Sequence, residues 1–150
     1  MPSLNIDQIM TFLPHRPPML LLDRILDYEC GVWATGLKTV TTNEASFNVE
    51  RAGHGIMPAY LVLELMNQTS AMILLTDPAF KDTTPIVAGF EHARFRRPVT
   101  TGDRLIVHAE LYKFKRNIGR IRATASVDGV DVAKVEIVSM LAPSEDLAKG

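Results

Sequence analysis

Residues 57–75 read MPAYLVLELMNQTSAMILL, and a helix with this sequence carries apolar side chains on nearly every side. Pro58 suits the first helical turn. Asp77-Pro78 predicts the end of the helix, because a residue before proline avoids the helical conformation. About 17 residues at 1.5 Å each form a rod of roughly 25 Å. The pattern predicts a buried central helix around which the rest of the chain packs.

Three polar residues interrupt this helix at the spacing i, i+3 and i+4, namely Glu64, Asn67 and Gln68, and Ala71 continues the same face. The free energy needed to place these polar side chains in the hydrocarbon core of a bilayer argues against a membrane span. A buried carboxylate must be paired, protonated or directed at a wet cleft. Two interpretations of Glu64 follow: a structural side chain bonded to the backbone or Gln68, or a catalytic carboxyl with a raised pKa.

The residues before the central helix predict a short helix, a few strands and a loop. Ser3 or Asn5 can cap a helix over Ile6–Phe12, and the apolar run Met19–Leu22 predicts the buried start of a strand that continues to Leu26. A β-rich pattern follows over Gly31–Val40. Residues 43–56 have no period, so we expect a loop that leads into the central helix, where free backbone N–H groups favour negative charge.

The residues after the central helix predict strands separated by turns, and Asp128-Gly129 is a strong hairpin signal. The polar tail, residues 143–150, is expected to be mobile. One long helix followed by an antiparallel meander predicts an α+β fold, in which a single domain of residues 1–150 curls its sheet around the helix. The expected strands are Ile86–Phe95, Arg104–Phe114, Gly119–Val127 and Val132–Leu141.

Composition narrows the function classes. The 150 residues are 47% hydrophobic with a net charge of −1, and the few aromatic residues are not interleaved with basic ones, which disfavours a nucleic-acid partner. The single cysteine, Cys30, excludes an internal disulfide and a cysteine-based zinc cluster. No pair of histidines has metal-ligand spacing with a carboxylate, so no metal is expected. The N-terminus lacks the pattern of a signal peptide, and a cytoplasmic protein is expected.

Several motifs then point to one protein family. Read in order, they closely resemble the 3-hydroxyacyl-acyl-carrier-protein (ACP) dehydratases of fatty-acid synthesis, proteins with the hotdog fold, over about residues 9–141. The motifs are Leu13-Pro14-His15-Arg16, Leu22-Asp23-Arg24, Val40–Glu44, Met57-Pro58 with Leu63-Glu64 and Gln68, and Ala93–Val99 with Gly102-Asp103.

The resemblance implies a dimer of hotdog domains, often assembled further as a trimer of dimers, with acyl tunnels at the dimer interface. It implies that Glu64 is a catalytic carboxyl opposite a histidine of the other subunit. The substrate arrives on the phosphopantetheine of ACP, and no other cofactor is implied. His15 belongs to a family motif outside the chemistry. Expected substrate-binding residues are Gly55, Met57, Pro58, Ala59, Gln68 and Phe95.

Basic residues gather at a strand end and around a hairpin. They form either solvated outer faces or a docking patch for the acidic carrier protein. The residues expected in such a patch are Arg96, Arg97 and Arg116.

The sequence departs from the family pattern before the central helix. Counting without gaps places Glu50 where the family has its catalytic histidine, His54 lies four residues downstream, and Ala59 replaces a glycine. Three interpretations remain open. The protein is a dehydratase that uses His54 or Glu50 with Glu64; or it runs another acyl-thioester reaction, such as isomerisation or hydrolysis; or it is a non-catalytic subunit that binds acyl-ACP or pairs with a paralogous hotdog chain.

Overall fold

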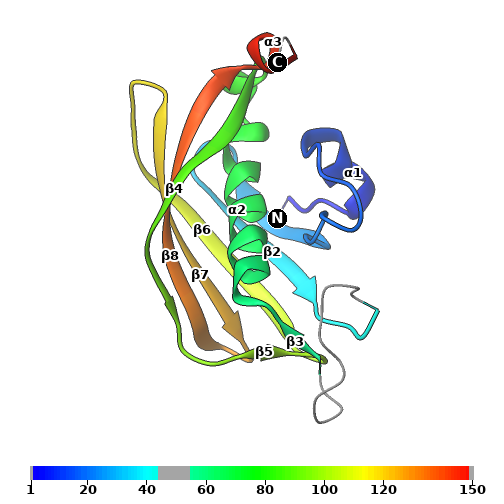
Figure 1. Ribbon diagram of the computed structural model, residues 1–150. Helices are drawn as coiled ribbons and strands as arrows, with labels where there is room; N and C mark the ends of the chain where they lie inside the picture. The colour runs from blue at the N-terminus through cyan, green and yellow to red at the C-terminus, as the bar shows by residue number, and fades with distance from the viewer. Residues whose placement is uncertain (1, 44–54, 149–150) are drawn as a thin grey trace.

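The structure of the protein is a computed structural model that describes residues 2–43 and 55–148. Its centre is helix α2, Ala59–Leu75, which is 17 residues long. Figure 1 shows α2 lying in the curve of a sheet, with helix α1, Ile6–Phe12, on the side away from that sheet. The predicted central helix and the predicted N-terminal helix are both confirmed.

One antiparallel sheet wraps around α2. It has six strands in the order β1-β2-β6-β7-β8-β4, so the long strand β4 forms one edge and, among the described residues, pairs only with β8. This α+β arrangement confirms the fold expected from the sequence. The strands are β1 Arg24–Glu29, β2 Trp33–Thr39, β4 Thr83–Phe95, β6 Arg104–Lys115, β7 Ile118–Val127 and β8 Val130–Pro143.

Short elements fix the two ends of α2. A two-stranded ladder joins β3, Ile56–Met57, to β5, Val99–Thr100, just before α2 begins. The 3-10 helix η1, Pro78–Phe80, follows the other end, and the Asp77 carboxylate caps it by accepting from the Ala79 N–H. Both ends of α2 are therefore anchored by local structure.

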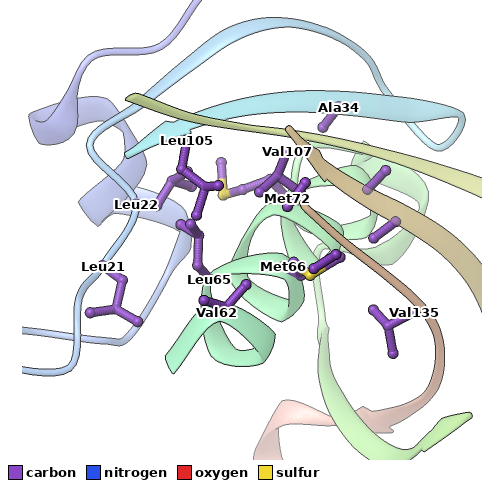
Figure 2. Close-up of a cluster of buried hydrophobic side chains, with 14 of the residues drawn as sticks. Leu21, Leu22, Ala34, Val62, Leu65, Met66, Met72, Leu105, Val107 and Val135 are labelled. Carbon is purple, nitrogen blue, oxygen red and sulfur yellow. The ribbon is translucent and has the colours of Figure 1, made fainter. Parts of the chain in front are cut away.

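The core lies between α2 and the concave face of the sheet. Figure 2 shows Leu65, Met66 and Met72 of α2 among buried side chains of the strands, including Leu105 and Val107. Gly36 on β2 allows the close approach, because a Cβ there would lie 2.6 Å from Thr69 Oγ1 on α2. Burial of this face supplies the main driving force for the fold.

Three details differ from the expectations. Residues 19–22 are not a strand: Leu21 and Leu22 are buried, but their N–H groups donate to the Gln68 side chain instead of a strand partner. β4 begins before Pro85, which a strand tolerates at a sheet edge, where no partner needs the missing N–H. The expected mobile tail begins with a short helix, α3, Ser144–Ala148.

In the described part of the chain, no helix has both the length and the apolar character needed to cross a bilayer.

Candidate active site

A hollow of about 390 Å³ lies at the N-terminal end of α2, and we call it the entry hollow. It brings together residues from β3, α2 and the end of β4, which are far apart in the sequence. The expected substrate-binding residues Met57, Pro58, Ala59 and Phe95 line it beside Arg96 and Arg97. Gly55 lies one residue before β3, where its carbonyl accepts a hydrogen bond from the Thr101 N–H at 2.9 Å.

The first turn of α2 points free backbone donors towards this region. Pro58 is the N-cap, and no side chain caps the helix. The N–H groups of Leu61 and Val62 bond to the Pro58 carbonyl, so the earlier N–H groups of the turn have no intrahelical acceptor. The Ala59 side chain is exposed. A helix N-terminus of this kind stabilises negative charge that develops on a bound carbonyl.

The Glu64 carboxylate lies one turn and a half further along α2 and is bound by two neighbours. His15 Nε2 lies 3.2 Å from Glu64 Oε1, and the Gln68 amide donates to the same oxygen at 3.0 Å. The Glu64 side chain is 25% exposed, so it is accessible from outside the core. Glu64 is thus both paired and open to solvent.

The pKa of Glu64 is lowered from its usual value of 4.5. Burial acts to raise it, but the hydrogen bonds from His15 and Gln68, together with the charge of His15, outweigh burial. The expectation of a raised pKa is therefore wrong. Glu64 is ionised at neutral pH, which makes it a proton acceptor.

Gln68 is fully buried, and all four of its amide hydrogen-bonding positions are used. Its oxygen accepts from the Leu21 and Leu22 N–H groups at 3.0 and 3.3 Å. Its nitrogen donates to the Met19 carbonyl at 2.7 Å and to Glu64. This leaves no free group for a substrate, so Gln68 acts by fixing residues 19–22 and the carboxylate.

His15 is the site residue that sequence reasoning missed. It was placed outside the chemistry, yet it contacts Glu64 from a segment 49 residues earlier in the chain. It also lines a second hollow of about 260 Å³ beside Asn67, which we call the side hollow. Its position within the Leu13–Arg16 motif was the only signal, and the motif does not say which residue His15 contacts.

Two expected catalytic residues, Glu50 and His54, lie outside the described residues. Their proposed roles stay predictions. Of the three expected catalytic groups, the structure therefore describes Glu64 alone.

The expected docking residues occupy two places. Arg96 and Arg97 border the entry hollow, and Arg97 pairs with Asp103 at 3.3 Å. Arg116 lies at the β6–β7 turn with Lys113, Lys115 and Arg120. Figure 1 shows this turn at the end of the sheet away from β5, so one protomer does not join the three arginines in a single patch.

A group of potential metal ligands does occur, although the sequence spacing did not suggest one. Strand pairing places Glu91 opposite Glu136, and together with His92 their ligand atoms lie within 4.8 Å of one another. Both carboxylates already pair with arginines, Glu91 with Arg120 and Glu136 with Arg122. These pairs account for the two carboxylates without an ion.

Comparisons with solved structures agree on the fold. The chain resembles the dehydratase heterocomplex ApeI:P from Xenorhabdus doucetiae with a TM-score of 0.76 and 18% identity, covering 94% of this chain and 95% of that one. It also resembles a hypothetical thioesterase with coenzyme A from Streptococcus pneumoniae, with a TM-score of 0.64 and 12% identity over 79% and 84% of the two chains. At these identities the likeness shows the hotdog fold alone.

Sequence relatives are more specific. Residues 13–136 match the family model described as a FabA-like domain. The chain is 44% identical to 3-hydroxyacyl-ACP dehydratase FabZ of Herpetosiphon aurantiacus, over 87% of this chain and 93% of that protein. It is 41% identical to the enzyme of the same name from Brucella ovis, over 95% and 91%. The chain belongs to the FabZ family of 3-hydroxyacyl-ACP dehydratases.

Proposed function

We propose that the protein dehydrates 3-hydroxyacyl-ACP to the 2-enoyl thioester, and hydrates it in reverse, with Glu64 as the base. The observation that carries the proposal is an ionised, accessible carboxylate on a largely apolar helix, with hydrogen bonds from His15 and Gln68. An apolar residue would pack at least as well at such a position, so stability alone does not account for the carboxylate.

The reaction needs two proton transfers. Glu64 takes the proton from C2, the C2–H electrons form the C2=C3 double bond, and the C3–O bond breaks. The departing hydroxyl takes a proton from an acid and leaves as water. Free N–H groups at the start of α2 would stabilise the charge on the thioester carbonyl. Elimination of this kind requires no metal or redox cofactor, and the substrate is carried on phosphopantetheine.

The acid is the open part of the mechanism. In the family the helix glutamate works opposite a histidine of the other subunit, and counting without gaps places Glu50 at that position, with His54 four residues later. We propose that one of these two groups protonates the leaving hydroxyl. Glu50 can do so if a facing carboxylate raises its pKa.

The test is dehydration of 3-hydroxyacyl-ACP and hydration of the enoyl thioester by the unaltered protein and by Glu64→Gln, Glu50→Ala and His54→Ala. Glu64→Gln should lower kcat by about 10²- to 10⁴-fold, the usual contribution of a general base. The decrease should be similar for whichever of Glu50 and His54 is the acid. Full activity of Glu64→Gln would remove Glu64 from the mechanism.

A second candidate function follows from Glu50 at the histidine position: a non-catalytic subunit that binds acyl-ACP or pairs with a paralogous hotdog chain. It predicts that the protein is inactive on every thioester and that Glu50→His gains activity. Hydrolysis and isomerisation of the thioester are the remaining alternatives. With the same substrates, release of free thiol measures hydrolysis and migration of the double bond measures isomerisation.

We propose that Arg96 and Arg97 dock the carrier protein at the entry hollow, with the phosphopantetheine reaching past Met57 and Phe95. The Phe95 side chain is exposed here. Reversing Arg96 and Arg97 to glutamate should weaken acyl-ACP binding, with a loss that shrinks as salt rises. Arg116→Glu is the matched comparison for each single reversal, Arg96→Glu or Arg97→Glu, because the same charge change is made at the other end of the sheet. A loss only in Arg116→Glu would move the docking site to that turn.

We propose that two copies join along β4 into a homodimer in the cytoplasm, where the reducing conditions suit the free Cys30. β4 is an edge strand of 13 residues with the exposed Phe90 in its middle, and no strand in the described ranges pairs with its outer side. Unpaired edges readily accept another strand. Phe90→Lys should shift the protein towards a monomer in sedimentation, whereas Val130→Lys, an exposed apolar residue at the β7–β8 turn, should not. A monomer that dimerises only with a paralogous chain would favour the heteromer. A hexamer would indicate further assembly.

A further inference from the structure

The inference concerns His15 and rests on the proposed function of Glu64. His15 lies in the segment between α1 and β1, and its ring is 29% exposed. Nε2 faces Glu64 Oε1 at 3.2 Å, whereas Nδ1 is buried and has no hydrogen-bond partner among the described residues. Since an ionised carboxylate has no proton to give, the proton in this contact belongs to Nε2.

The two hydrogen bonds to Glu64 are distributed unequally over its oxygens. His15 and Gln68 both bind Oε1, and no described residue binds Oε2. Oε1 is therefore held from two directions, one from the N-terminal segment and one from α2 itself. Oε2 is left free to accept a proton from a substrate.

His15 is held in place on both sides along the chain. The guanidinium of the next residue, Arg16, reaches back and donates to the Leu13 carbonyl at 2.9 Å, to the His15 carbonyl at 2.7 Å and to the Met10 carbonyl at 3.1 Å. Downstream, the Gln68 amide fixes Met19, Leu21 and Leu22. A side chain carried by a backbone segment fixed in this way can impose an orientation on its partner.

We propose that His15 is a positioning residue whose Nε2–H fixes Glu64 Oε1 and thereby aims Oε2 at the C2 proton of the substrate. The same contact keeps the carboxylate ionised. Other charged groups near the pair are few: Lys81 is the only charged side chain among the described residues that line the side hollow, and the Arg16 guanidinium is engaged by carbonyls. Tyr60, one turn before Glu64, is exposed.

The test uses His15→Phe, which keeps a ring without a donor, and His15→Gln, whose amide can reach as Nε2 does. His108→Gln is the control, because His108 bonds Thr35 on the sheet and not Glu64. We expect His15→Phe to lower kcat by about 10- to 100-fold with little change in KM, as for a misaligned catalytic group. His15→Gln should recover most of that loss.

Two readouts separate positioning from a merely structural role. In His15→Phe, the acid limb of the pH profile of kcat/KM and the titration of the Glu64 carboxyl carbon in NMR should both move to higher pH, and in His108→Gln neither should move. The NMR titration needs no substrate, so it still reports on His15 if Glu64→Gln proves fully active and the proposed function fails. An unchanged Glu64 titration in His15→Phe overturns the inference.

If His15→Phe does not fold, the unaltered protein decides. The inference requires the His15 ring to carry its proton on Nε2 wherever Glu64 is ionised, which ring nitrogen shifts report directly. A ring with its proton on Nδ1 alone overturns it.

Discussion

Leu65 and Glu64 are neighbours on α2 but lie in opposite surroundings. Leu65 is fully buried among the core side chains in Figure 2, whereas Glu64 is 25% exposed and contacts polar groups of the N-terminal segment. The sheet side of the helix can be filled by any apolar side chains that fit. The other side needs particular atoms at particular places. One helix therefore holds the domain together and presents a carboxylate.

The largest change in stability should come from the sheet side. Leu65→Ala removes a fully buried side chain and leaves a cavity, which should lower the free energy of unfolding by about 2 to 5 kcal/mol. Activity per folded molecule should stay near that of the unaltered protein. Chemical denaturation and kcat at a temperature where both proteins are folded check this; a large loss of kcat in the folded variant would show that the two sides are not separable.

A smaller loss should come from Gln68→Glu, which keeps the shape of the side chain but replaces two donor positions by an acceptor. The Met19 carbonyl and Glu64 each lose a hydrogen bond, at a cost of about 1 to 3 kcal/mol. Protonation of the new carboxyl restores one donor, so the destabilisation should shrink in acid. Unfolding curves at pH 7 and pH 5 measure it, and an equal loss at both values would contradict this account.

The smallest effect is the contribution of Glu64 itself to stability. Because its pKa is lower in the folded chain than the ordinary 4.5, ionised Glu64 stabilises the fold above pH 4.5, and this contribution disappears as pH falls through the folded pKa. The difference in unfolding free energy between the unaltered protein and Glu64→Gln should therefore decrease on acidification in that range. Thermal unfolding of both proteins between pH 3 and 7 checks it, and a difference that grows in acid would contradict the lowered pKa.

The fold could be predicted because its signals are local. The long apolar run between Pro58 and Asp77-Pro78 marked α2, and the hairpin turns marked β6 to β8. Asn5 caps α1 through reciprocal 2.9 Å bonds with Gln8. The prediction of a strand over residues 19–22 was wrong. A continuous apolar run does not reveal that its N–H groups donate to the Gln68 side chain on α2 and not to a neighbouring strand.

The site could be predicted only in part for a related reason. Glu64 and Gln68 are one helical turn apart, so their contact follows from spacing. The contact between Glu64 and His15 joins residues 49 positions apart, and no periodic pattern in the sequence predicts it. The direction of the Glu64 pKa shift was missed for the same reason. An apolar helix indicates burial, which raises the pKa of a carboxyl, whereas the contacts that lower it come from His15, far away in the sequence, and from the orientation of the Gln68 side chain.

The Gln68 amide also sets an order of events during synthesis. It binds residues 46 to 49 positions earlier in the chain, so the segment that carries His15 is translated before its anchor exists. At about 5 to 20 residues per second, the wait is roughly 2 to 10 s. Until Glu64 has been translated, His15 has no carboxylate to meet, and the nascent N-terminus cannot form the His15–Glu64 contact on its own.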